Sequence, residues 1–321
     1  MGHTARPEDD IEAKLDEINK RTGRNMVQAV VTGALLVILV VASLIFNTQI
    51  FLWLVIIFVC IALWELRVDF STIGIRIPLI PLIIMTVGTL AAIYYVPAQQ
   101  PALTAALGCT ITAALSVIFS CFENFKSAKV ERSLSQKAPH SKNNIEHIEL
   151  EHSRLTHIGA TLLAVFYITV LGSFIVLPVT RDHPVAFEFM VIFLPSLGDI
   201  GGLAFGAAFG KHKLSPRISP KKSVEGLIGS VLFSAIGSFV IGVFAYSHTQ
   251  FAQHVVELII LGICVGIVGL FGDLCASMLK RDMGLKDMGT LLAGHGGVLD
   301  RVDSILMCAP VICILIMALG L

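Results

Sequence analysis

Charged residues are scarce in this chain of 321 residues: only 14% are Asp, Glu, Lys or Arg, whereas 55% are hydrophobic. A soluble domain carries roughly 25% charged residues, so the composition excludes an ordinary soluble enzyme and indicates an integral membrane protein in a lipid bilayer. The formal net charge is zero, and we expect no nucleic-acid partner.

Cysteine pairs with the C-x-x-C spacing of metal sites are also absent. The seven cysteines fall in or beside apolar runs, and we expect nearly all of them to be small buried hydrophobic residues. We expect no cleavable signal peptide, because residues 1–26 are polar and the apolar run after them is longer than a signal sequence.

The chain has instead a series of long apolar runs, each close to the roughly 20 residues that an α-helix needs to cross a bilayer. They cover residues 27–47, 48–66, 77–96, 102–122, 158–180, 187–209, 224–247, 254–279 and 302–321. The sequence therefore predicts an all-α, polytopic membrane protein with about nine transmembrane helices. We divide it into a cytosolic N-terminal segment (1–26), an N-terminal transmembrane region (27–180) with a mobile cytosolic loop at 123–157, and a C-terminal transmembrane region (181–321).

The basic residues lie almost entirely on one side of this arrangement. All of the 23 lysines and arginines except Arg181 lie before the first span or in the loops that follow even-numbered spans. The positive-inside rule makes that side cytoplasmic. We therefore expect a cytoplasmic N-terminus and a C-terminus on the outer side.

One dense polar stretch interrupts the apolar pattern and reads GDLCASMLKRDMGLKDMGTLLAGHGGVLDRVD, from Gly272 to Asp303. Ionised groups at the edge of hydrocarbon are costly and are rarely there for packing. Asp273, Ser277 and Lys280 are spaced to share one helix face. Carboxylates at both ends of the stretch, with basic residues and flexible glycines between them, suit a divalent cation and phosphate oxygens.

A second polar block begins in the run 187–209. Gly198, Gly202, Gly206 and Gly210 recur every four residues, which predicts close helix–helix packing. Asp199 beside them needs a partner, such as a metal ion or a lysine. The loop after the last glycine reads KHKLSPRISPKKSVEG. Its basic residues are compatible with topology and headgroup attraction alone, but its two Ser-Pro steps stiffen it, which topology does not require.

These two blocks resemble the signature of the CDP-diacylglycerol synthases (phosphatidate cytidylyltransferases). The C-terminal block has that family's G-D-L, S-x-x-K-R, K-D-x-G, H-G-G and D-R-x-D elements in order, and the upstream block resembles its G-K-H-K-L-x-P-x-I-S-P-K-K-x-x-E-G segment. The sequence departs from the pattern at Ala276, Ala293, Leu203 and Ala207. The first departure removes a carboxylate from the site. The first five spans carry no motif.

The resemblance implies an enzyme of phospholipid biosynthesis that uses CTP and phosphatidate and releases CDP-diacylglycerol and pyrophosphate, with Mg²⁺ as cofactor. It also implies a homodimer in the inner (plasma) membrane. Phosphatidate stays in the leaflet while CTP and Mg²⁺ arrive from the cytosol, so we expect the active site at the cytoplasmic face.

We assign Asp273 and Asp300 as metal ligands, with Asp303 and Asp199 as weaker candidates. Basic side chains should hold the substrates' phosphate oxygens: Lys280, Arg281, Lys286, Lys221 and Lys222. The remaining substrate-binding candidates are Ser219, Pro220, Asp287, Gly296, Gly297 and Arg301, with the glycines letting backbone N–H groups approach the triphosphate.

Three of the assigned residues have more than one interpretation. Ser277 would donate to a phosphate oxygen or orient a metal ligand. His295 is more easily explained as a positioning group than as a general base, because phosphatidate is already ionised near neutral pH. Arg301 is also suited to a structural ion pair with Asp300 or Asp303.

Other functions stay open from the sequence. A CTP-dependent lipid kinase of the polyprenol type would transfer the γ-phosphoryl group to an alcohol and release CDP. An anion transporter would also use membrane aspartates and basic loops, but it predicts inverted repeats, and we find none. A scramblase or a purely structural role would leave the dense polar stretch unexplained.

Overall fold

The structure is a computed structural model that describes residues 26–96, 100–137, 153–180, 184–216, 218–285, 288–289 and 297–321. The predicted N-terminal segment lies almost wholly outside the described residues. Side chains are described from Val31 onward, except those of residues 123–137 and of Pro220 and Lys221.

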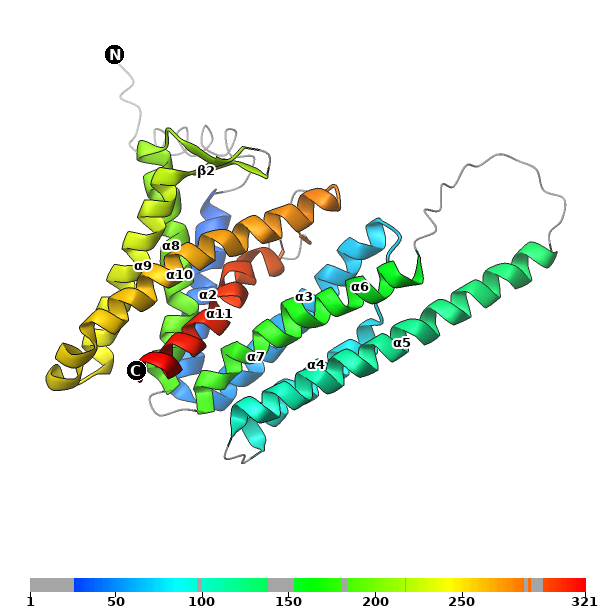
Figure 1. The fold of residues 1–321 in the computed structure, drawn as a ribbon, viewed down its shortest axis with the longest axis horizontal. Coiled ribbons are helices and arrows are strands. Elements are labelled where there is room, and N and C mark those ends of the chain that lie inside the picture. The colour runs from blue at the N-terminus through cyan, green and yellow to red at the C-terminus, as the bar shows by residue number, and fades with distance from the viewer. Residues whose placement is uncertain are drawn as a thin grey trace, which may run out of the picture.

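Helices make up nearly all of the described chain (Figure 1). The first four are α2 (Met26–Phe46), α3 (Thr48–Thr72), α4 (Leu79–Tyr95) and α5 (Pro101–Lys137). The fifth predicted span is four consecutive segments: α6 (Arg154–Ala164), the π-helix η1 (Val165–Val170), α7 (Leu171–Val176) and the 3₁₀-helix η2 (Leu177–Thr180). The last four helices are α8 (Pro184–Phe209), α9 (Val224–Ala245), α10 (His248–Asp282) and α11 (Leu299–Leu319).

Each predicted apolar run coincides with a helical segment. Within the described ranges, seven helices are long and apolar enough to cross a membrane, namely Thr48–Thr72, Pro101–Phe122, Arg154–Thr180, Pro184–Phe209, Val224–Ala245, His248–Asp282 and Leu299–Leu319. Two shorter apolar helices, Val31–Phe46 and Leu79–Tyr95, match the first and third predicted runs. The multi-pass helical class is thus confirmed, whereas the count of nine and the cytoplasmic N-terminus stay predictions.

The predicted loop 123–157 is wrong in its first part, because α5 continues as a helix to Lys137. Its hydrophobic stretch ends at Phe122, but residues 123–137 contain no glycine or proline to stop the helix. Hydropathy marks where a helix leaves the bilayer and not where it ends. Figure 1 shows α5 extending past the other helices.

The all-α prediction also missed a small sheet. Strands β1 (Lys213–Ser215) and β2 (Ser219–Ser223) pair antiparallel within the basic loop after α8. At the base of this hairpin the N–H of Val224 donates to the carbonyl of His212 at 2.9 Å. The Glu225 carboxylate also accepts from the His212 ring at 2.7 Å. The Ser-Pro steps thus belong to a folded hairpin, since proline presets the backbone of a turn.

Small residues bring α8, α9 and α10 into close contact, as the glycine spacing predicts. A Cβ added at Gly198 would lie 2.7 Å from the hydroxyl of Ser234 on α9. That hydroxyl donates to the carbonyl of Leu194 at 3.0 Å, and Ser230 donates to that of Gly266 on α10 at 3.0 Å. Serine hydroxyls therefore tie the helices together where backbones approach closely.

Helix α11 joins the two predicted regions. It packs against α10 and α8 from the C-terminal region and against α7 and α3 from the N-terminal region. Cys308 is buried near the carbonyl of Val265, and Cys313 is buried near that of Phe174. The expected burial holds for these two cysteines, but Cys275 lies exposed on the surface of α10.

Candidate active site

The candidate site lies where five elements meet: the C-terminal halves of α3, α8 and α10, the first two turns of α11, and strand β2. Side-chain contacts link all of them. Figure 1 shows β2, the end of α10 and the start of α11 on the same side of the molecule. The two polar blocks of the sequence, which are far apart along the chain, therefore form one region.

Lys222 connects the hairpin to α10. Its ammonium group contacts the Asp273 carboxylate at 2.5 Å and donates to the carbonyl of Leu270 at 3.3 Å. Ser277 donates to the same carboxylate at 3.4 Å, as expected for residues one helical turn apart. The shared face of Asp273 and Ser277 is thus confirmed. The sequence did not predict the ion pair of Asp273 with Lys222.

Asp199, Asp273 and Asp303 form an acidic group contributed by α8, α10 and α11. Asp199 and Asp303 lie near each other and near Asp273. The hydroxyl of Ser304 lies 3.5 Å from Asp199, and its backbone N–H donates to Asp303 at 2.7 Å. Within the described ranges, no group of three or more His, Cys, Asp or Glu side chains is arranged to hold a metal ion as it stands.

The donor chemistry of this acidic group nevertheless fits Mg²⁺. Mg²⁺ favours hard oxygen ligands, usually one or two carboxylates completed by waters and substrate phosphates, so a cage of three protein ligands is not required. Asp273 and its neighbours provide carboxylate and hydroxyl oxygens of that kind. The residues present therefore fit the predicted ion.

Asp300 has different surroundings from Asp273. Its carboxylate accepts from the Lys280 ammonium group at 2.8 Å and from the backbone N–H of Met288 at 2.9 Å. Both side chains are largely buried, with 5% of Asp300 and 12% of Lys280 exposed. Each Asp300 oxygen thus has a partner. The assignment of Asp300 as a metal ligand stays a prediction.

Two acidic residues of α3 belong to the site although no motif marks them. Glu65 is fully buried, and its two carboxylate oxygens accept from the backbone N–H groups of Val298 and Leu299 at 2.9 and 2.8 Å. Asp69 lies one turn further on and is also buried. Their spacing of four positions in an apolar helix was the available signal, because acidic residues in a membrane helix usually face a partner.

Tyr167 is a further residue that the sequence did not single out. It lies in the π-helix η1, is buried, and its hydroxyl has no hydrogen-bond partner among the described residues. The ionisable groups near this hydroxyl are Asp303, Asp300, Cys275 and Asp273. A π-turn changes the direction of side chains within a helix and is frequent at functional sites.

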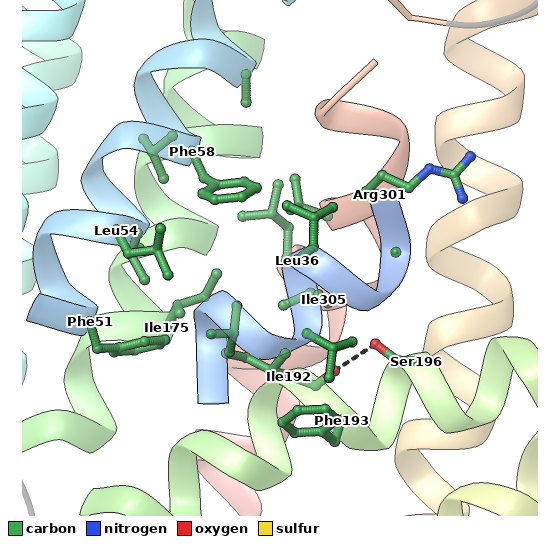
Figure 2. A pocket seen from close by; sticks show the side chains of 18 of the residues that line it. Leu36, Phe51, Leu54, Phe58, Ile175, Ile192, Phe193, Ser196, Arg301 and Ile305 are labelled. Atoms are coloured by element: carbon green, nitrogen blue, oxygen red, sulfur yellow. Dashed lines mark hydrogen bonds between the residues drawn. The ribbon is translucent and has the colours of Figure 1, made fainter. Parts of the chain in front are cut away.

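An apolar pocket of about 450 Å³ adjoins the polar region. Its walls come from α2, α3, η1, α7, α8 and α11, with Leu36, Phe58, Ile192 and Ile305 among the lining residues. Figure 2 shows these side chains turned toward one another, while the guanidinium group of Arg301 lies at the edge. The pocket therefore has hydrocarbon walls and a cationic rim.

The remaining predicted site residues are described in part. Arg281 is exposed, and Ser219 lies in β2 with the backbone of Pro220 and Lys221. Gly297 is buried against the carbonyl of Met288. Four predicted residues lie outside the described chain: Lys286, Asp287, His295 and Gly296.

Several known proteins similar to this chain are named for one type of activity. Residues 27–319 match the model of the cytidylyltransferase family. A phosphatidate cytidylyltransferase of Mycobacterium bovis is 30% identical over 290 residues, covering 90% of this chain and 87% of its own length. One from Mycobacterium leprae is 30% identical over 291 residues, covering 91% of this chain and 87% of its own. One from Staphylococcus saprophyticus is 37% identical over 172 residues, covering 52% and 63%.

Proposed function

Because this chain belongs to the cytidylyltransferase family, we propose that it transfers the cytidylyl group of CTP to phosphatidate, giving CDP-diacylglycerol and pyrophosphate. The observation that carries the proposal is that a charged site and an apolar pocket lie side by side. Lysines and carboxylates gather at helix ends, and an apolar pocket with an arginine at its rim lies beside them.

The nucleotide is assigned to the polar side. Lys222 and Lys280 are held by Asp273 and Asp300 and so are already oriented. Pre-oriented cations stabilise the charge of a triphosphate without the cost of ordering flexible side chains. The basic residues in the hairpin and at the end of α10 thus hold the phosphate oxygens of CTP.

Asp273, with Asp199 and Asp303, would hold Mg²⁺. When bound, the ion would neutralise charge on the triphosphate and on the departing pyrophosphate. Ser277 would orient the Asp273 carboxylate, to which it already donates.

The lipid is assigned to the pocket. A volume of about 450 Å³ is in the range of small-molecule sites, and its apolar walls match an acyl chain. Arg301 at the rim would pair with the phosphate of phosphatidate, since a guanidinium group binds two phosphate oxygens at once. In this arrangement the lipid phosphate faces the triphosphate.

The reaction then needs positioning and charge neutralisation more than proton transfer. A phosphate oxygen of phosphatidate forms a bond to the α-phosphorus of CTP. The bond from that phosphorus to the bridging oxygen breaks, and pyrophosphate leaves with the electron pair. The attacking oxygen is already ionised, so a general base is not required, and His295 keeps its predicted positioning role.

The predicted topology supports a cytoplasmic site. The basic hairpin and the polar stretch 272–303 are on the side that the positive-inside rule makes cytoplasmic. CTP is available there, and phosphatidate reaches the pocket from the inner leaflet. We therefore propose a nine-span enzyme of the inner membrane with a cytoplasmic N-terminus. The homodimer implied by the family resemblance stays a prediction.

The test is to incubate the purified full-length protein in detergent with CTP, Mg²⁺ and phosphatidate and to measure released pyrophosphate. We expect release only when all three are present. Diacylglycerol, which has the same acyl chains without the phosphate, is the matched control. Release of CDP with either lipid would instead show the lipid kinase activity.

A further inference from the structure

The described chain on the two sides of residues 290–296 meets at a single buried carboxylate. The chain before this segment, at Met288–Gly289, and the chain after it, at Gly297–Leu299, lie on either side of Glu65. Glu65 itself belongs to α3, 233 positions from Val298. A residue of the first half of the protein therefore organises the polar stretch of the second half.

The carboxylate acts as a cap for α11. The first N–H groups of a helix have no partner within that helix, and the N-cap residue usually supplies one from its side chain. Val298 occupies this position and has no polar side chain. Glu65 accepts from the N–H groups of Val298 and Leu299 instead, and its negative charge is favourable at a helix N-terminus.

Two glycines allow the backbone to approach Glu65 this closely. Gly289 has φ +68°, a conformation that favours glycine, and an added Cβ would lie 2.6 Å from the nearer Glu65 oxygen. A Cβ on Gly297 would lie 2.8 Å from the other oxygen and would collide with the carbonyl of Met288. Asp300, in the first turn of α11, also accepts from the N–H of Met288, so the Met288–Gly289 backbone is tied to α11 as well as to Glu65.

We propose that Glu65 is a positioning residue for nucleotide binding. It holds the first turn of α11 and the Met288–Gly289 backbone together, which sets the place of Asp300 and its partner Lys280. The expected effect of Glu65 on the KM for CTP rests on the proposed function, because Lys280 is taken to bind CTP. The expected protection of the Val298 and Leu299 amides from hydrogen exchange does not depend on that function.

The test compares Glu65→Gln with Glu188→Gln. Both replacements exchange a fully buried carboxyl group in a helix for an amide, but Glu188 lies near the start of α8 and Glu65 near the end of α3. In Glu65→Gln an amide NH₂ faces one backbone N–H, and one hydrogen bond to a charged group is lost. We expect the KM for CTP to rise about tenfold or more and the KM for phosphatidate to change less than about twofold.

Hydrogen exchange gives the second measurement. The amides of Val298 and Leu299 should exchange about tenfold faster in Glu65→Gln and at the wild-type rate in Glu188→Gln. Should Glu65→Gln not fold, Glu65→Asp keeps the charge but is one methylene shorter, and we expect a smaller rise in the KM for CTP.

The outcomes separate this inference from the proposed function. An inactive wild-type protein would contradict the proposed function, while amide exchange would still test the cap. An active wild type whose Glu65 variants keep the normal KM for CTP would overturn the positioning role. Equal loss of kcat in the two Gln variants, with no change in the KM for CTP, would overturn it as well.

Discussion

Lys280→Met is the substitution that best separates stability from function at this site. Lys280 and Asp300 are 12% and 5% exposed and lie 2.8 Å apart. Removing one partner of a buried ion pair leaves the other charge without compensation, at a cost of about 3–5 kcal/mol. Asp300 keeps its hydrogen bond from Met288, so we expect the low end, about 3 kcal/mol.

The double variant Lys280→Met with Asp300→Asn completes a mutant cycle. It removes both charges, and the asparagine oxygen still accepts from the N–H of Met288. We expect it to recover most of the stability lost in the single variant, which appears as a coupling energy. Cytidylyl transfer should stay reduced by about 10²-fold or more in the single and the double variant, because the predicted phosphate contact is missing in both.

The measurements are the free energy of unfolding in mixed detergent micelles and the rate of cytidylyl transfer. Arg281→Met is the matched control for stability, because it removes the neighbouring but exposed cation and should change stability by less than about 0.5 kcal/mol. Recovery of activity together with stability in the double variant would refute the phosphate-binding role of Lys280. An unchanged stability in Lys280→Met would refute the argument from burial.

Three further substitutions test other parts of the site. Asp273→Asn should abolish Mg²⁺-dependent transfer of labelled CTP while the protein stays folded; near wild-type turnover would remove Asp273 from the metal site. Tyr167→Phe should leave stability unchanged, because the hydroxyl has no partner among the described residues, and should lower kcat/KM by about tenfold or more; unchanged kinetics would make the residue purely structural. Ile305→Trp should fill the pocket and raise the KM for phosphatidate alone, whereas Ile314→Trp, at a 57% exposed position on α11, should not; equal effects would argue against the pocket as the lipid site.

The helices were predictable from the sequence because each apolar run is long enough to mark its own helix. The small-residue contact of α8 with α9 was predictable for a similar reason, since glycines every four residues leave one helix face bare. The hairpin at 213–223 was not, because β1 has only three residues and the hairpin sequence KLSPRISPKKS does not alternate apolar and polar residues as a strand pattern would.

The predicted site residues and the observed contacts agree in part. The spacing of Asp273 and Ser277 correctly placed them on one face. The partners of these residues depend on tertiary packing, which spacing does not report: Lys222 reaches Asp273 only through the hairpin. Glu65 and Tyr167 were missed because they stand outside both motifs, and only the three-dimensional fold brings them to α11.

The central claim is that the cytidylyl group, and not the terminal phosphate, moves to the lipid. The most direct measurement uses CTP labelled with ³H in the cytosine ring and ³²P in the γ-phosphate, with phosphatidate and Mg²⁺ and the full-length protein. The account predicts ³H in the extracted lipid and ³²P in soluble pyrophosphate. Finding ³²P in the lipid and ³H in soluble CDP would contradict it.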